Sequence, residues 1–181
     1  VQGERATPGQ DTQGATPRES ATERREGQEA PLVINEIVAA AADGGDDWVE
    51  LYARGDSPVT LSDFTLVDDN PDHAPVVLPE VVVEPGDFFI LLALDASIEG
   101  VPSLPWKLGG DDGLWLARDG EVVDSLDWEE GDAPEGTSFG RLPDGTPHAT
   151  LLTPTPGEAN LAWQGDIPEA TDSPEECDLF P

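Results

Sequence analysis

Glu36 and Glu50 are the paired carboxylates of this chain that acid–base chemistry could use. Such a pair can serve as general acid and general base only if the strands that carry it are neighbours and present both side chains on one face. Other catalytic patterns are missing from the sequence: there is no G-x-S-x-G motif, no convincing Ser-His-Asp order and no phosphate-binding glycine loop. The sequence therefore predicts a protein that is not an enzyme.

Acidic residues gather in three predicted turns, and carboxylate oxygens are the ligands that a hard cation such as Ca²⁺ prefers. The turns contain Asp43, Asp46 and Asp47, then Asp68, Asp69, Asn70 and Asp72, and finally Asp111 and Asp112. The second turn is the best candidate for a metal site. No EF-hand spacing is present, and a chain this acidic also places carboxylates in loops by chance. We predict no resident cofactor and keep calcium binding as the alternative.

Four large apolar residues stand in segments that read as loops and are candidates for contact with a partner. Trp106 and Trp128 lie beside Pro, Lys and Glu, so we expect them to be exposed, either against a protein or stacked on a sugar. Leu179 and Phe180 are isolated in an acidic C-terminal segment, where they favour docking on a partner.

The charge of the chain limits the partners it can bind. There are 39 acidic and 8 basic residues, which gives a net charge of −31. Nucleic acid and anionic membrane surfaces would be repelled by such a charge. A single lysine, Lys107, accompanies this acidity, a pattern that salt adaptation would produce. No stretch is long and apolar enough to span a membrane as a helix. Cationic protein partners and divalent ions are compatible with the composition.

The chain divides into a central domain and two arms. Residues 1–30 contain no aromatic residue and are rich in polar and charged residues, so they cannot bury enough surface to fold alone. Residues 31–161 form the predicted domain, and residues 162–181 form an acidic C-terminal arm. The single cysteine, Cys177, excludes an internal disulfide and leaves an intermolecular one open. Because the sequence begins with Val1, we expect a processed product whose removed or unseen leader carried a signal peptide or lipid anchor.

Short apolar runs separated by turn residues predict an all-β protein. The expected strands are Leu32–Ile37, Trp48–Tyr52, Phe64–Val67, Val81–Val83, Phe88–Ala93, Leu114–Ala117, Val122–Asp127 and Thr137–Leu142. Several alternate apolar and polar residues, as antiparallel strands with one buried face do. Asp119-Gly120 predicts a tight hairpin, because Gly accepts the positive φ of a type I′ turn. A single helical turn is expected at Val38–Ala42. This pattern favours a β-sandwich.

Several of these segments together resemble the lamin tail domain, in the version found in bacterial extracytoplasmic proteins. The resemblance covers residues 31 to 161. The segments that carry it are Asn35-Glu36, Asp47–Tyr52, Val59–Asp69, Pro85–Leu92, Leu108–Leu116, Gly120–Ser125, Ser138–Gly145 and Thr153–Asn160. Ala53-Arg54 and Ser62-Asp63-Phe64 depart from the usual pattern. The resemblance implies an immunoglobulin-like antiparallel β-sandwich, here with extended N- and C-terminal arms.

The resemblance also assigns a structural role to the two glutamates. Glu36 and Glu50 match recurring motif positions, where a strand glutamate accepts hydrogen bonds and pins a loop. Arg141, one of four basic residues in the folded region, is the expected partner of such a carboxylate in a bidentate pair.

We therefore expect a non-catalytic, extracytoplasmic bacterial subunit, located in the periplasm, on the cell surface or secreted. It would dock onto a protein partner or larger assembly through its arms and sandwich surface. The alternatives are a calcium- or carbohydrate-binding surface module and an accessory domain of a secreted enzyme.

Overall fold

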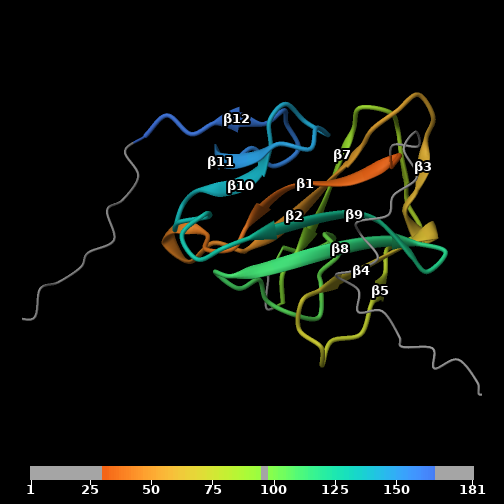
Figure 1. Cartoon of the computed structure of the whole chain (residues 1–181), viewed down its shortest axis with the longest axis horizontal. Coiled ribbons are helices and arrows are strands. Elements are labelled where there is room, and N and C mark those ends of the chain that lie inside the picture. Colours follow the sequence, from red (N-terminus) through yellow and green to blue (C-terminus); the bar gives the residue numbers. More distant parts are fainter. Residues whose placement is uncertain (1–29, 95–97, 166–181) are drawn as a thin grey trace, which may run out of the picture.

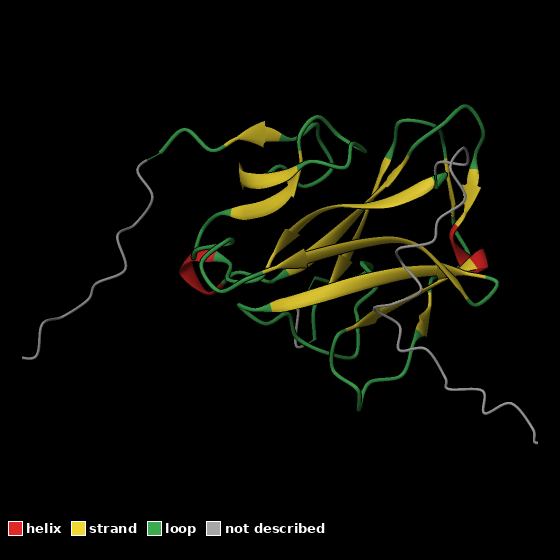
Figure 2. Ribbon diagram, in the orientation of Figure 1, coloured by secondary structure: helices red, strands yellow, loops and turns green. Residues whose placement is uncertain are grey.

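The computed structural model describes residues 30–94 and 98–165, which form a β-sandwich (Figure 1). Its strands are β1 Leu32–Val38, β2 Trp48–Ala53, β3 Val59–Thr60, β4 Phe64–Asp68, β5 Val76–Val77, β6 Val82–Val83, β7 Phe88–Leu92, β8 Asp112–Arg118, β9 Glu121–Trp128, β10 Ser138–Arg141, β11 Ala149–Thr153 and β12 Leu161–Ala162. Helical structure in these residues is limited to two 3₁₀ turns, η2 Ala42–Gly44 and η3 Leu61–Asp63 (Figure 2). The predicted all-β fold is confirmed.

Two sheets make the layers of the sandwich. The larger sheet has six strands in the order β12-β11-β10-β1-β2-β7, and the smaller has four in the order β5-β4-β8-β9. A separate pair, β3 and β6, is two residues long on each side. Figure 1 shows β12, β11 and β10 at one end of the larger sheet and β7 at the other. In the described part of the chain no helix is long and apolar enough to cross a membrane.

The eight predicted strands correspond to β1, β2, β4 and β6–β10. Four strands were not predicted: β3, β5 and β12 are two residues long, too short to show alternation, and β11 has one fully buried residue, Leu152. The predicted helical turn at Val38–Ala42 is displaced to η2. Asp119 and Gly120 have φ values of 54° and 81°, so the tight hairpin between β8 and β9 has the predicted positive φ at both central residues.

An irregularity in β1 decides which residues face the core. The pairing register between β1 and β2 shifts between Ile34 and Glu36, so Asn35 is an extra residue, a β-bulge. Because strand side chains alternate between faces, the extra residue resets the alternation. Ile34 and Ile37 therefore both enter the core between the sheets, and Glu36 turns to the outer face of the larger sheet.

The bulge brings β10 very close to β1. A Cβ atom built on Gly140 would lie 2.3 Å from the carbonyl oxygen of Asn35 and 2.8 Å from the Cα atom of Glu36. Both neighbours are backbone atoms, so a side chain at position 140 could not be accommodated by rotating a flexible group. Gly140 is the residue that lets β10 dock beside the bulge.

Candidate functional site

Glu36 and Glu50 are directly opposite each other on β1 and β2 and project from the outer face of the larger sheet. This is the arrangement that acid–base chemistry would require. Both residues, however, are completely buried, with 0% relative exposure. The loops that follow β10 and β11 contribute the groups that cover them, so neither carboxylate opens onto a cleft.

Glu36 binds the C-terminal part of the domain through both of its oxygens. Its Oε1 accepts hydrogen bonds from the hydroxyl of Ser138 on β10 and, at 3.2 Å, from the backbone N–H of Thr155. Its Oε2 lies 3.1 Å from the Thr155 hydroxyl. Glu36 therefore joins β1 to β10 and to the loop after β11.

Glu50 makes the corresponding contacts from β2. Its Oε2 accepts a hydrogen bond of 2.6 Å from the backbone N–H of Gly157, and its Oε1 accepts one of 3.2 Å from the side-chain amide of Asn35. The same Asn35 amide donates to Asp144 at 2.9 Å, and its carbonyl oxygen accepts from the N–H of Gly145 at 3.0 Å. The bulged residue thus connects the carboxylate of β2 to the loop after β10.

Asn160 completes this buried network, which we call the polar clasp: Asn35, Glu36, Glu50, Ser138, Asp144, Thr155 and Asn160. The Asn160 side chain donates to the backbone oxygen of Arg141 at 2.8 Å and to that of Asn35 at 3.3 Å. Its backbone N–H donates to Asp144 at 3.1 Å. The predicted structural role of Glu36 and Glu50, as strand glutamates that pin loops, agrees with these contacts.

Burial sets the electrostatics of the polar clasp. Removal from water raises the pKa of Glu50 from 4.5 to about 7, although hydrogen bonds from Gly157 and Asn35 oppose the shift; the charges of Glu36 and Asp144 add to it. Burial likewise raises the pKa of Glu36, against the hydrogen bonds from Ser138 and Thr155. A raised carboxyl pKa is also a property of catalytic acids. Here the covering loops leave no room for a substrate to reach the carboxyl groups.

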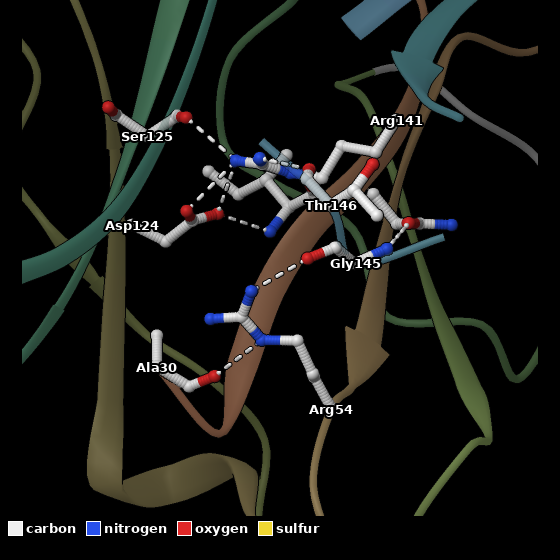
Figure 3. Close-up of polar contacts among 9 residues, drawn as sticks. Ala30, Arg54, Asp124, Ser125, Arg141, Gly145 and Thr146 are labelled. Atoms are coloured by element: carbon white, nitrogen blue, oxygen red, sulfur yellow. Dashed lines mark hydrogen bonds and ion pairs between the residues drawn. The ribbon is translucent and has the colours of Figure 1, made fainter. Parts of the chain in front are cut away.

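Arg141 pairs with Asp124 on β9, and the predicted pairing with Glu36 or Glu50 is wrong. Its Nη2 lies 2.9 Å and 3.1 Å from the two carboxylate oxygens of Asp124 (Figure 3). Its Nε donates to the backbone oxygen of Ile34 at 2.7 Å, and Asp124 accepts the N–H of Ile34 at 2.8 Å. Arg141 points between the sheets, toward β9, whereas the two glutamates lie on the outer face.

The same region holds the start of the domain. Arg54, just after β2, donates from Nε to the backbone oxygen of Ala30 at 3.2 Å and from Nη1 to that of Gly145 at 2.7 Å (Figure 3). A cavity of about 260 Å³ lies beside it, lined by Ala30, Pro31, Arg54, Gly55, Asp56 and Ser57. Arg54 is one of the residues at which the sequence departs from the family pattern. Its two hydrogen bonds hold the backbone at Ala30, before β1, against the loop after β10.

The predicted calcium ligands do not converge. Asp68 is buried at the end of β4, where its Oδ2 lies 2.7 Å from Nδ1 of His73. Asn70 accepts the backbone N–H of Asp72 at 3.0 Å, and Asp69, Asn70 and Asp72 are exposed. Within residues 30–94 and 98–165, no three Asp, Glu, His or Cys side chains are grouped so that they could hold a metal ion. Calcium binding stays a prediction.

Asp112, the first residue of β8, holds the turn that precedes this strand. Its carboxylate accepts the backbone N–H groups of Gly109 at 2.9 Å and Gly113 at 2.8 Å. Burial raises the pKa of Asp112 despite these two hydrogen bonds, and the nearby charges of Asp69 and Asp68 raise it further. The acidic turn that contains Asp68 and Asp69 therefore lies near the one that contains Asp112, and Asp112 serves to shape its own turn.

The expectation that Trp106 and Trp128 are exposed is wrong. Their relative exposures are 2% and 1%, and both belong to the main core. Trp128 donates from Nε1 to the backbone oxygen of Gly109 at 2.9 Å, and Trp106 stacks on His73 at 5.6 Å between ring centroids. Neither ring can stack on a sugar or meet a partner in this structure. Leu179 and Phe180 lie outside the described residues.

Several residues of these networks were missed by sequence reasoning. Asp124 sits in a strand with an acid-rich neighbourhood, so nothing distinguishes it from its exposed neighbours. Thr155 and Asn160 fall inside Thr153–Asn160, a segment that carries the family resemblance. That position is the only indication in the sequence that they have a structural role. Their partner Asn35 lies 125 residues from Asn160, a separation over which no local pattern can act.

Comparison with known proteins agrees with this architecture. The sequence profile of the Lamin Tail Domain family matches residues 26–130, more than half of the chain. No curated protein matches the sequence. The matched range contains β1–β9, and β10–β12 lie beyond it. Lamin tail domains are immunoglobulin-like, non-enzymatic domains with structural and protein-interaction roles. The chain is a member of the Lamin Tail Domain family.

Proposed function

We propose that this protein is a non-catalytic interaction subunit that docks onto a larger protein assembly outside the cytoplasm. The observation that carries the proposal is the complete burial of Glu36 and Glu50 beneath the loops that they hold. The two carboxylates with the best placement for acid–base chemistry are committed to the fold. Membership of a family of interaction domains supports the same conclusion.

The surface, rather than a cleft, then carries the function. The rings of Tyr52 and Phe88 pack in a tilted arrangement, 5.1 Å between centroids, on the outer face of the larger sheet, where both are half-buried. Leu94 and Ile98, which follow β7 in the sequence, are exposed by 44% and 54%. These apolar residues are the part of the surface that we propose a partner protein contacts.

The charge of the chain indicates the class of partner. Residues 31–181 hold 33 acidic and 4 basic residues, a net charge of −29. A basic protein surface would be attracted to such a domain and would associate faster with it at low ionic strength. The arms at residues 1–30 and 162–181 would extend the contact, with Leu179 and Phe180 as apolar anchors. Location in the periplasm, on the cell surface or in the medium is part of this proposal.

Purification from the native source tests the proposal. The protein would be crosslinked in intact cells, isolated with the envelope and secreted fractions, and analysed by size exclusion and mass spectrometry. We expect a stoichiometric protein companion in an extracytoplasmic fraction. A protein that elutes as a lone monomer from every fraction, or that is confined to the cytoplasm, would contradict the proposal.

A further inference from the structure

The edge formed by β7 is open over half of its length. β7 pairs only with β2, as the last strand of the six-stranded sheet. The backbone N–H groups of Ala53 and Ala93 donate to Asp87 and Asp47 across this pair. In an antiparallel ladder the hydrogen-bonded positions alternate, so the intervening residues of β7, Phe88 and Ile90, direct their N–H and C=O groups away from β2.

Leu92, the next residue of β7 whose backbone groups point away from β2, has hydrogen-bond partners. Leu92 donates its N–H to Pro102 at 2.9 Å and accepts from Leu104 at 2.7 Å, so residues 102–104 cover the edge there. No hydrogen bond joins the outward groups of Phe88 or Ile90 to another described residue. The edge is therefore closed at Leu92 and open at Phe88 and Ile90.

Within β7 itself, the open edge carries no charged residue and no proline. Edge strands in soluble proteins are blunted by charged residues, prolines or bulges, because unpaired backbone groups recruit other strands. β7 consists of Phe88-Phe89-Ile90-Leu91-Leu92, with no charged residue, and its first three side chains are half-buried. The β9 edge of the smaller sheet differs, because the carbonyl of Ser125 on β9 already accepts a hydrogen bond from Arg141 at 3.0 Å.

Acidic residues stand at both ends of the open edge. Glu84 and Asp87 are exposed in the turn that precedes β7, and Glu99 is exposed in the turn that follows it. These charges and the net charge of the chain oppose pairing with a second copy of the same edge. They favour a partner segment whose apolar residues pack on Phe88 and Ile90 and whose ends are basic.

We infer that the open edge of β7, at Phe88 and Ile90, binds an extended segment of a partner protein as an added β-strand, with alternating apolar residues and basic ends. This inference rests on the proposed function and names the kind of contact that it uses. Backbone hydrogen bonds to β7 would hold the segment, and the outer-face aromatic pair Tyr52 and Phe88 would select its apolar side chains.

A synthetic peptide tests the inference directly. The probe is a capped heptapeptide, Arg-Val-Thr-Val-Thr-Val-Arg, titrated into the ¹⁵N-labelled protein at low salt. We expect the amide signals of Phe88 and Ile90 to shift and their hydrogen exchange to slow. The same peptide with Glu at both ends should bind more weakly. An absence of shifts at these two amides would overturn the inference.

Two further comparisons, one between modified peptides and one between protein variants, separate strand pairing from general attraction. N-methylation of the three valines and N-methylation of the two threonines remove donors from opposite edges of the extended peptide, so one modified peptide should lose binding and the other keep it. Phe88→Lys should weaken binding about tenfold. Val77→Lys, at the β5 edge where Val77 is 63% exposed, is the matched control and should leave it unchanged. Edge pairing would be contradicted if the two methylated peptides bound equally well, or if Phe88→Lys and Val77→Lys weakened binding equally.

The test also distinguishes this inference from the proposed function. If native companions of the protein still co-purify with a folded Phe88→Lys variant, the edge is not their site and the inference is wrong, whereas the interaction function stands. If the wild-type chain has no companion, the proposed function itself fails.

Discussion

Arg141 on β10 and Asp124 on β9 form a buried ion pair of 2.9 Å that connects the larger sheet to the smaller one. Both side chains are 8% exposed, and Arg141 also donates to the backbone of Ile34 and Thr146. Together with Asp124 and Ser125, these carbonyl oxygens accept hydrogen bonds from nearly all of the guanidinium N–H groups. Such a pair is costly to break from one side, because the remaining charge stays buried without its partner.

Asp124→Ala should lower the free energy of unfolding by about 3–5 kcal/mol, measured by urea denaturation. Asp63→Ala is the matched control, because Asp63 pairs with Arg118 at 3.0 Å on the surface, with both side chains more than 40% exposed. We expect that control to cost less than about 1 kcal/mol. Equal losses in the two variants would contradict a structural role for the buried pair.

Gly140→Ala should destabilise the domain by about 1–3 kcal/mol or more, because the new methyl group would collide with the backbone of Asn35 and Glu36. Thr150 provides the control, because it lies on β11 directly opposite Gly140 and is exposed. Thr150→Ala should change the thermal midpoint little. A Gly140→Ala protein as stable as the wild type would show that β10 can move away from the bulge.

The stability of the domain should fall as the pH rises from 4.5 to about 7. The folded protein holds the Glu50 proton in this interval while the unfolded chain has released it, because the folded-state pKa is raised to about 7. The contribution of Glu50 is fully present below pH 4.5 and is lost as the pH passes through about 7; its size is roughly 3 kcal/mol.

Urea denaturation across this pH range measures the effect. Glu50→Gln removes the ionisation, so its stability should depend less steeply on pH over the same interval. The remaining slope would come from Glu36 and from the repulsion among the other acidic groups. Identical slopes in the wild type and the variant would show that Glu50 has an ordinary pKa.

A chain that ends at Glu130, where the family match ends, should not fold cooperatively. It would lack β10, which pairs with β1, and the loops whose N–H groups satisfy Glu36 and Glu50. Two carboxylates would then face water on a sheet with an open edge at β1. Residues 30–165 are the matched control and should unfold in a single transition by circular dichroism. A cooperative transition in the shorter chain would contradict the dependence on β10–β12.

The sequence was sufficient for the fold because the fold follows from local patterns. The short apolar runs in β1, β2, β8 and β9 and the Asp119-Gly120 turn predict strands and a hairpin without the structure, and the family pattern supplies the connection between them. The sequence alone does not predict that Glu36 and Glu50 lie opposite each other; it shows only that they could, if their strands were neighbours with both side chains on one face. The bulge at Asn35 that puts them on one face leaves no signature in the strand's composition.

The errors concern residues whose environment is set by distant chain segments. Trp106, in a loop, and Trp128, the last residue of β9, have polar neighbours in sequence, but both rings are buried and fill the core. Arg141 pairs with Asp124 on the smaller sheet and not with Glu36 or Glu50, which lie on its own sheet. Which of two faces a strand residue occupies beside a bulge, and which carboxylate lies across the core, depends on tertiary packing.

Amide hydrogen exchange at Thr155 and Gly157 is the most direct test of the central claim, that Glu36 and Glu50 serve to hold the C-terminal loops. The N–H groups of these residues donate to Glu36 and Glu50 at 3.2 Å and 2.6 Å. Both should exchange slowly in the wild type, and Glu50→Ala should speed the exchange of Gly157 far more than that of core amides in β8. If Gly157 exchanges equally fast with and without the Glu50 carboxylate, the glutamate does not hold the loop, and the structural account of the pair is wrong.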